Sequence, residues 1–329
     1  MVLRFSAALC GLILFSFEVS AQLKWQNVDS LYQPLPSSVH IYFTNDQMDT
    51  GYFRAYYLVA DLKDKHLDFT VDTSKDRRLT PSTFYERNEK PLAVVNCTFF
   101  SYETNRSLNV VIKEGKLVGY NINTVNGRGK DTFTYRHPLG SAIGISKKRK
   151  ADVAWLFTDS AMKYPIAFER KPELIKDSSI RISKFTFVPE LFHWPKREKR
   201  RGINDKWKMY TAVGGGPVLL QNGEIKITNN EELKFTGKAI DDKHPRTAMG
   251  YTNDGKLIIL MIEGRNKVAH GATLGQEAQI FKDLGCWEAL NLDGGGSSCL
   301  LVNGKETIKV SDAAGQRPVP AVFIIKNHD

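Results

Sequence analysis

Apolar and polar residues alternate in short segments along most of the chain, a pattern typical of β-strands with one buried face. Glycine, asparagine and proline separate the segments, as expected of turns. The alternation predicts strands at residues 39–43, 54–61, 66–71, 92–96, 153–157, 257–262, 288–292 and 321–325. A short helix is expected at residues 81–87.

A hairpin pattern occurs three times, at residues 110–118, 218–227 and 300–310. Each copy is an apolar strand, a turn containing Glu-Gly or Asn-Gly, and a second strand, which is a strong hairpin signal. The second and third copies both follow three consecutive glycines. This repetition favours a β-rich core with internal pseudo-symmetry, decorated by the irregular residues 147–207.

One longer helix is predicted at residues 274–284. Thr273 and Gln276 have the spacing of a capping box, and Gly285 is placed to end the helix. A strand is predicted on either side of this helix, so the order strand, helix, strand indicates a crossover between parallel strands. The sequence therefore predicts an α+β fold, with a β-rich mixed sheet core, repeated hairpins and one strand–helix–strand crossover.

The first 21 residues differ from the rest. Arg4 precedes an apolar run at residues 7–17, and Val19-Ser20-Ala21 follows as a small-residue cleavage pattern. This is the pattern of a secretory signal peptide, and the run is short for a membrane span. We expect an exported, periplasmic or extracellular protein without stable membrane insertion, starting near Gln22. Lead-in strands at 22–89 would pack on a main domain at 90–329.

Net charge limits the kinds of binding partner that we expect, and the cysteine count limits the number of disulfides. The formal net charge is +10, with basic runs at residues 147–150 and 196–201. These runs are either solvated loops or a means of attracting an anionic partner, such as a phosphoglycan or a membrane surface. Nucleic acid is not an expected partner, because no binding motif is recognisable. Cys286 and Cys299 could pair, but three mature cysteines do not make a disulfide scaffold.

The candidate chemistry centres on the stretch Asn291-Leu292-Asp293-Gly294-Gly295-Gly296-Ser297. Asp293 is either a turn cap or a carboxylate that acts on substrate or binds a cation. The three glycines can form an anion-binding nest, although they match neither the Walker nor the dinucleotide pattern. The crossover would place Glu263, at the end of another strand, on the same sheet edge as Asp293.

Other chemistries fit the stretch less well. Ser297 would need a base such as His244 or His270, and the Gly-x-Ser-x-Gly elbow of serine hydrolases is absent. No cluster has the spacing of a zinc site, so neither a metal nor another cofactor is expected.

Further polar residues stand at the ends of other predicted strands. Arg246 and Arg317 form either surface ion pairs or bidentate contacts with a phosphate. Asn96 and Thr98 follow a buried strand and precede two phenylalanines. An amide, a hydroxyl and aromatic rings suit a sugar, although phenylalanines are by default core residues.

Read together, these motifs resemble the phosphodiester glycosidase family over about residues 90–326. The blocks that carry the resemblance are Asn96-Cys97-Thr98-Phe99-Phe100, Pro245-Arg246-Thr247-Ala248-Met249-Gly250, Gly271-Ala272-Thr273-Leu274, Asn291-Leu292-Asp293-Gly294-Gly295-Gly296-Ser297 and Arg317-Pro318-Val319. The resemblance implies that one cavity is lined by Asn96, Arg246, Thr273, Asp293, Gly294, Gly295, Gly296, Ser297 and Arg317. It also implies hydrolysis of a sugar-1-phosphodiester of the N-acetylglucosamine-α-phosphoryl type.

Two departures from the family pattern bear on mechanism. Cys97 and Thr98 replace small residues, which narrows or repolarises one wall. The position usually held by glutamate in the helix is Gln276 here, and Glu277 follows it. Asp293 is the expected base or nucleophile, with Glu263 or Glu277 as the second carboxylate. The alternative is a surface protein that binds glycans or phosphoglycans without cleaving them.

Overall fold

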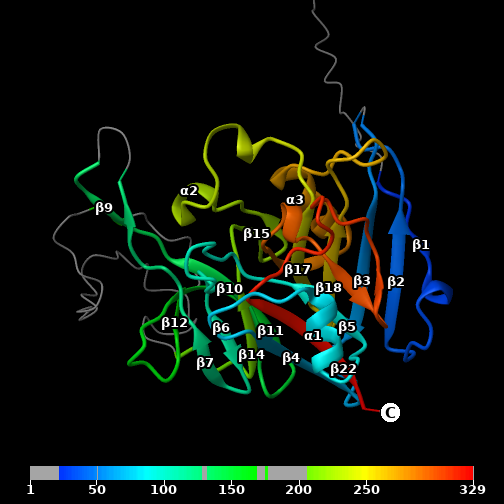
Figure 1. Cartoon of the computed structure of the whole chain (residues 1–329), viewed down its shortest axis with the longest axis horizontal. Coiled ribbons are helices and arrows are strands. Elements are labelled where there is room, and N and C mark those ends of the chain that lie inside the picture. Colours follow the sequence, from blue (N-terminus) through cyan, green and yellow to red (C-terminus); the bar gives the residue numbers. More distant parts are fainter. Residues whose placement is uncertain (1–21, 50, 128–131, 169–174, 177–205, 329) are drawn as a thin grey trace, which may run out of the picture.

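The structure is a computed structural model that describes residues 22–49, 51–127, 132–168, 175–176 and 206–328 (Figure 1). Its strands form four sheets, and every strand pair in this part of the chain is antiparallel. The signal peptide predicted at residues 1–21 and the basic run 196–201 lie outside the described residues.

The first sheet has the order β1 (Gln26–Asn27), β2 (Val39–Thr44), β3 (Ala55–Asp61), β18 (Lys256–Ile262), β17 (Arg246–Thr252), β19 (Cys286–Asn291), β15 (Val218–Gln221) and β16 (Glu224–Ile225). The second has the order β12 (Ile166–Phe168), β11 (Ala151–Phe157), β10 (Gly140–Ile145), β14 (Thr211–Gly214), β6 (Val111–Lys113) and β7 (Lys116–Gly119). The third is small, with β13 (Ile175–Lys176), β9 (Tyr135–His137) and β8 (Val125–Asn126). The fourth has the order β21 (Lys305–Glu306), β20 (Leu300–Val302), β5 (Ala93–Asn96), β22 (Ala321–Asn327) and β4 (Leu67–Thr73).

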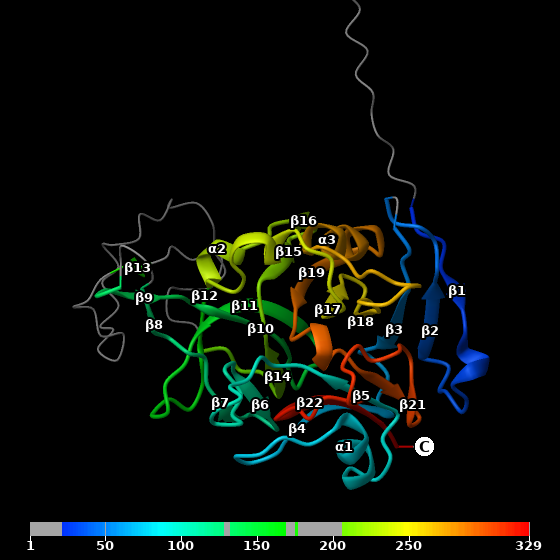
Figure 2. The ribbon, with the colours of Figure 1, turned by 45° about the horizontal axis from the view of Figure 1, so that its top comes forward.

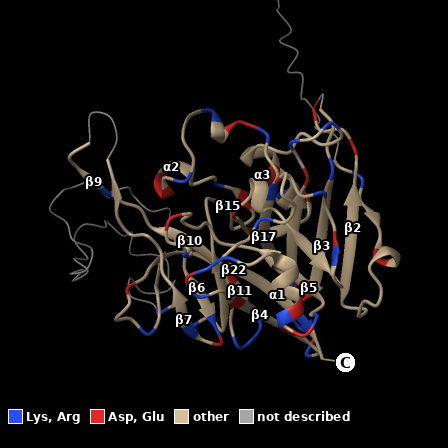
Figure 3. Ribbon diagram, viewed as in Figure 1, with Lys and Arg blue, Asp and Glu red and all other residues tan. Residues whose placement is uncertain are grey.

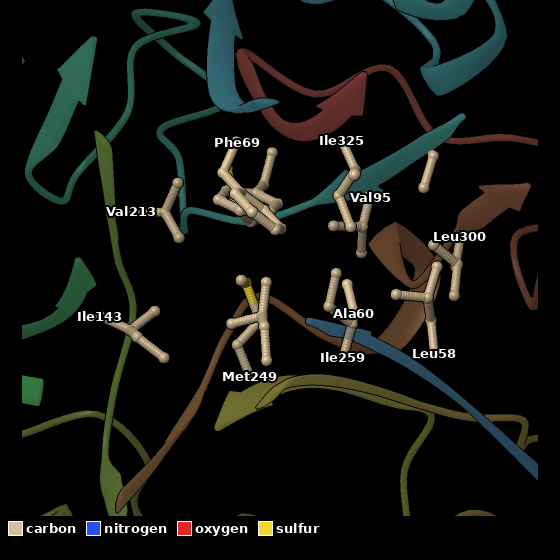
Figure 4. Packing of buried hydrophobic residues seen from close by; sticks show 14 of the residues in the cluster. Leu58, Ala60, Phe69, Val95, Ile143, Val213, Met249, Ile259, Leu300 and Ile325 are labelled. Carbon is tan, nitrogen blue, oxygen red and sulfur yellow. The ribbon is translucent and has the colours of Figure 1, made fainter. Parts of the chain in front are cut away.

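The first and fourth sheets pack face to face, with a helix on each outer side (Figure 2). Helix α3 (Leu274–Asp283) covers the first sheet, and α1 (Pro81–Arg87) covers the fourth. A third short helix, α2 (Asn229–Glu232), follows β16. The core between the sheets contains Met249 and Ile259 from one side and Phe69 and Val95 from the other (Figure 4). The β-rich α+β fold predicted from the sequence is thereby confirmed.

The crossover is present, with one difference from the expectation. Strands β18 and β19 each pair antiparallel with β17, so they run in the same direction with β17 between them. No parallel ladder forms, and the sheet is antiparallel rather than mixed. The predicted placement survives, because Ile262 ends β18 and Asn291 ends β19 at the edge where β17 begins with Arg246.

The three hairpins also form as predicted. Their turn residues Glu114-Gly115, Asn222-Gly223 and Asn303-Gly304 all have positive φ, between 48° and 78°. Two consecutive positive φ values define the type I′ turn, which matches the twist of the flanking strands. The capping box of α3 is present as well, with both the Thr273 and the Gln276 side chains engaged.

The N-terminal strands belong to the first and fourth sheets. Strand β3 pairs with β18 along seven residues, and β4 pairs with β22 along seven. Residues 22–89 therefore share the core of the rest of the chain. Cys286 and Cys299 are free and buried, so the pairing considered above does not form. Among the described residues, no helix is long and apolar enough to cross a membrane.

The basic run 147–150 lies at the turn between β10 and β11. Arg149 donates hydrogen bonds to the carbonyls of Leu67, at 2.6 Å, and Leu62, at 3.5 Å, and its guanidinium lies over Phe69. This arginine therefore fastens the turn to the start of β4. The positions of basic and acidic residues are interspersed along the described ribbon (Figure 3).

Candidate functional site

Asn96 joins the first and fourth sheets at the edge where the candidate residues meet. Its side-chain oxygen accepts hydrogen bonds from the Thr247 hydroxyl and the Cys299 amide, each at 3.0 Å. Its amide nitrogen donates to the carbonyl of Asp293 at 2.5 Å. The residue is fully buried. We expected Asn96 to contact a sugar, but both ends of its side chain are occupied by protein, so it instead positions the backbone of Asp293.

The three glycines after Asp293 allow two guanidinium groups to approach the backbone. A Cβ on Gly296 would collide with the guanidinium of Arg317, and one on Gly295 would lie 3.2 Å from that of Arg265. The predicted nest of N–H groups is largely occupied. Gly295 donates to the Pro245 carbonyl at 2.8 Å, and the N–H of Gly294 faces the carboxylate of Asp293. Positive charge at this turn therefore comes chiefly from arginine side chains.

Arg246 is the most enclosed of the three arginines at this edge. Only 3% of it is exposed, and it donates hydrogen bonds to the carbonyls of Ala272, at 3.0 Å, and Asp242, at 3.2 Å. Burial is the main reason why its pKa is lowered, and the nearby Arg265 lowers it further. An anionic ligand would stabilise the desolvated Arg246 and relieve its repulsion from Arg265, which supports the predicted phosphate site.

The sequence did not predict Arg265 as a residue of this site. It lies in the loop after Glu263, with φ of +61°, and one guanidinium nitrogen is 3.3 Å from Nδ1 of His244. The sequence signal for Arg265 was its position, three residues beyond the strand that ends at this edge with Ile262. Arg317, which was predicted, is held by Asp312 through a 2.8 Å hydrogen bond.

Two carboxyl groups lie among these cations: Glu277 is fully buried, and Asp293 is partly exposed. Burial raises the pKa of Asp293 to about 7, against the opposing effects of Ser297, Arg317 and the Gly294 amide. Burial raises the pKa of Glu277 to about 8, and the charge of Arg246 opposes the increase. Both oxygens of Glu277 and Oδ2 of Asp293 are buried without a hydrogen-bond partner. A carboxyl group that titrates near neutrality is suited to proton transfer.

Glu263 has a different environment, although it also ends a strand at this edge. It accepts hydrogen bonds from the Asn266 side chain, at 2.9 Å, and the Lys309 amide, at 3.4 Å. The guanidinium of Arg54 lies 4.0 Å away. These partners make Glu263 an anchor for two loops. Of the two candidates for the second carboxylate, the free one is Glu277.

Gln276, which stands where the family usually has glutamate, lies in the first turn of α3 and caps the start of this helix. The side-chain oxygen of Gln276 completes the capping box by accepting from the backbone N–H of Thr273 at 3.0 Å. The side-chain nitrogen of Gln276 donates to the carboxylate of Asp49. The Thr273 hydroxyl accepts from the Gln276 amide at 3.2 Å. Both side chains thus stabilise the start of the helix, which gives Thr273 a structural role beside its predicted contact with substrate. The next residue, Glu277, points into the protein toward Arg246.

Two hydroxyl groups also lie buried near these carboxyl groups. Oγ1 of Thr98 has no hydrogen-bond partner, and Oγ of Ser297 lies beside the carboxyl group of Asp293. Buried polar groups are nearly always paired in folded proteins, so a concentration of unpaired ones marks a ligand site. No hydrogen bond to histidine activates Ser297, and burial lowers the pKa of His244. The serine-hydrolase arrangement is therefore not formed.

Guanidinium groups, two carboxyl groups of raised pKa and buried hydroxyl groups therefore meet at one sheet edge. Residues 192–326 match the family model described as phosphodiester glycosidase. The match covers less than half of the chain, and it is this C-terminal part that is similar to the phosphodiester glycosidase family.

Curated relatives match short segments. The chain is 39% identical over 82 residues to the SPbeta prophage-derived uncharacterized protein YomE of Bacillus subtilis, covering 25% of this chain and 13% of that protein. It is 32% identical over 100 residues to N-acetylglucosamine-1-phosphodiester alpha-N-acetylglucosaminidase of Mus musculus, covering 28% of this chain and 19% of the enzyme. The matched segments thus span less than a fifth of these relatives.

Solved structures share the fold over most of the chain. The catalytic domain of zebrafish N-acetylglucosamine-1-phosphodiester alpha-N-acetylglucosaminidase, auto-inhibited by its pro-peptide, has a TM-score of 0.58 at 20% identity and covers 93% of this chain and 89% of that one. A hypothetical protein from Synechocystis has a TM-score of 0.60 at 15% identity, with coverage of 92% and 64%. At these identities the likeness establishes the fold alone.

Proposed function

We propose that this protein hydrolyses a sugar-1-phosphodiester of the N-acetylglucosamine-α-phosphoryl type, releasing the sugar and a phosphomonoester. The observation that carries the proposal is the juxtaposition of Arg246, Arg265 and Arg317 with the free carboxyl groups of Asp293 and Glu277. The family match and the activity named for the mouse relative agree with this chemistry.

In the proposed reaction, water adds to the anomeric carbon and the bond from that carbon to the phosphate oxygen breaks. The electron pair of the broken bond goes to the phosphate. Because the second pKa of a phosphomonoester is about 6, the leaving group needs little protonation. The three arginines stabilise its charge instead, as cationic groups do for a leaving phosphate.

Asp293 and Glu277 supply the proton chemistry. Ionised Asp293 takes the proton from water, or attacks the anomeric carbon first if configuration is retained. Glu277, with a pKa of about 8, is protonated at neutral pH and can donate a hydrogen bond to the substrate. Activity is then expected to rise with pH through about 7, as Asp293 ionises, and to fall above about 8, as Glu277 loses its proton.

The test is release of free sugar from N-acetylglucosamine-α-phosphoryl-mannoside by residues 22–329, comparing wild type with Asp293→Asn. We expect the variant to lose at least 100-fold in kcat/KM, or about 2.7 kcal/mol of transition-state stabilisation. Asp254→Asn, at an exposed turn, is the matched control and should keep wild-type activity. Turnover by Asp293→Asn within tenfold of wild type contradicts the assignment.

Binding of the substrate by wild type without release of sugar would instead favour the alternative, a surface protein that binds phosphoglycans. The departure at Gln276 motivates this second possibility, because the usual glutamate is absent there. The location of Glu277 beside Arg246 favours the enzyme. Export remains part of the proposal, and a mature protein that starts at Gln22 by N-terminal sequencing would support it.

A further inference from the structure

A second group of residues adjoins the phosphate-binding arginines and is not used by the chemistry above. The ring of Phe235 lies under Arg246, with the guanidinium carbon 5.7 Å from the ring centre. Phe99 meets Phe235 edge to face, with ring centres 6.0 Å apart. On Phe99 lies the ammonium of Lys234, 5.2 Å from the ring centre. Arg246, Phe235, Phe99 and Lys234 therefore form a continuous row of contacts.

The backbone around this group is firmly held. The side-chain amide of Asn229 brackets Phe235, donating to its carbonyl at 2.9 Å and accepting from its N–H at 3.0 Å. Leu233 adopts the left-handed conformation, with φ of 51°, at the turn that presents Lys234. Asn109 likewise joins the Phe99 N–H to the Gly215 carbonyl. Fixed aromatic and cationic groups of this kind are expected of a preorganised binding site.

The first run of three glycines makes room for Lys234. A Cβ on Gly216 would collide with the side chains of both Lys234 and Glu232. Gly216 also donates its N–H to the carbonyl of Asn291 at 2.7 Å, two residues before Asp293. The Lys234 side chain therefore runs alongside the backbone that leads to the proposed catalytic residue.

Lys234 has unused hydrogen-bonding capacity. The nearby carboxylate that interacts electrostatically with Lys234 is that of Glu232. The oxygens of Glu232 already accept hydrogen bonds from other residues. Ser141, Trp155, Val218 and Thr228 donate to the two oxygens of Glu232 at 2.6–3.2 Å. Among the described residues, no acceptor lies within hydrogen-bonding distance of the Lys234 ammonium.

From this geometry we propose that Phe99, Phe235 and Lys234 form the sugar subsite, and that Lys234 determines specificity by donating a hydrogen bond to an oxygen of the sugar. Aromatic rings bury the C–H face of a sugar, and an ammonium supplies three donors to its oxygens. Because Glu232 balances the charge of Lys234, the subsite suits a neutral acceptor, such as a hydroxyl or an amide carbonyl. This inference rests on the proposed function for the identity of the ligand.

Calorimetric binding tests it without relying on turnover. All proteins carry Asp293→Asn, so that the ligand is not consumed, and the probes are N-acetylglucosamine 1-phosphate and inorganic phosphate. We expect Lys234→Met to weaken binding of the sugar phosphate at least tenfold and binding of inorganic phosphate less than twofold. Arg265→Ala is the matched control, because it should weaken both probes. Equal weakening of both probes by Lys234→Met, or no weakening of either, overturns the proposal.

Two further measurements keep the test decisive. If Lys234→Met does not fold, because Glu232 loses its balancing charge, Lys234→Met combined with Glu232→Gln removes both charges. Nε2 of the glutamine can donate to Ser141, while its oxygen keeps the other three donors. Glucuronic acid 1-phosphate should bind no more than threefold tighter than glucose 1-phosphate, and a larger preference overturns the neutral acceptor. Failure of sugar release with this binding pattern intact would refute the hydrolase alone.

Discussion

The buried carboxyl group of Glu277 makes a quantitative prediction about stability and pH. Burial raises its pKa from 4.5 to about 8, so the folded state favours the protonated form. The stability contributed by protonation is complete below pH 4.5 and is lost as pH rises through about 8. The full difference is 3.5 pKa units, which corresponds to roughly 5 kcal/mol. Glu277→Gln removes the titration and should remove this dependence.

The change in the free energy of unfolding can be measured between pH 6 and pH 9. A group with these two pKa values lowers the free energy of unfolding by about 2 kcal/mol at pH 6 and about 5 kcal/mol at pH 9. Wild type should therefore lose about 3 kcal/mol more than Glu277→Gln over this interval. Urea unfolding at both pH values measures the difference, and comparison with the variant cancels groups that titrate alike in both proteins.

The constant effect of the amide does not disturb the test, because only the change with pH is compared. If the two proteins lose stability in parallel, within about 0.5 kcal/mol, Glu277 is not a buried acid of raised pKa and its assignment as a proton donor is wrong.

Three further changes test other parts of the structure. Asn96→Ala leaves buried donors without an acceptor and should lower the free energy of unfolding by about 3 kcal/mol in urea titrations, whereas a loss under 1 kcal/mol would deny its role in joining the sheets. Gly296→Ala displaces the guanidinium of Arg317, so kcat/KM should fall about tenfold or more, and unchanged kinetics would remove Arg317 from phosphate binding. Gly304→Ala, at φ of +77°, should lower the thermal midpoint through a cost of about 1 kcal/mol without altering kcat/KM, and equal loss of activity would contradict its remoteness from the site.

Features with a local physical cause could be predicted from the sequence. The strands follow from alternation, because successive side chains point to opposite faces of a sheet. The hairpin turns follow from the tolerance of asparagine and glycine for positive φ, and the start of α3 follows from the capping box of Thr273 and Gln276. The same reasoning placed Glu263 and Asp293 at one sheet edge, because strand order and connection length restrict where strands end.

The roles of individual residues at that edge depended on long-range contacts. Glu263 and Glu277 are the same amino acid, and only their surroundings distinguish an anchored carboxylate from a free one. Asn96 was expected to bind substrate, yet partners distant in the chain occupy its amide. Arg265 and Lys234 lie in loops without a periodic pattern, so only the folded chain brings them to the site. Local sequence determined the elements of this protein, whereas tertiary packing decided which polar groups remain free, because desolvation and pairing depend on residues far apart in the chain.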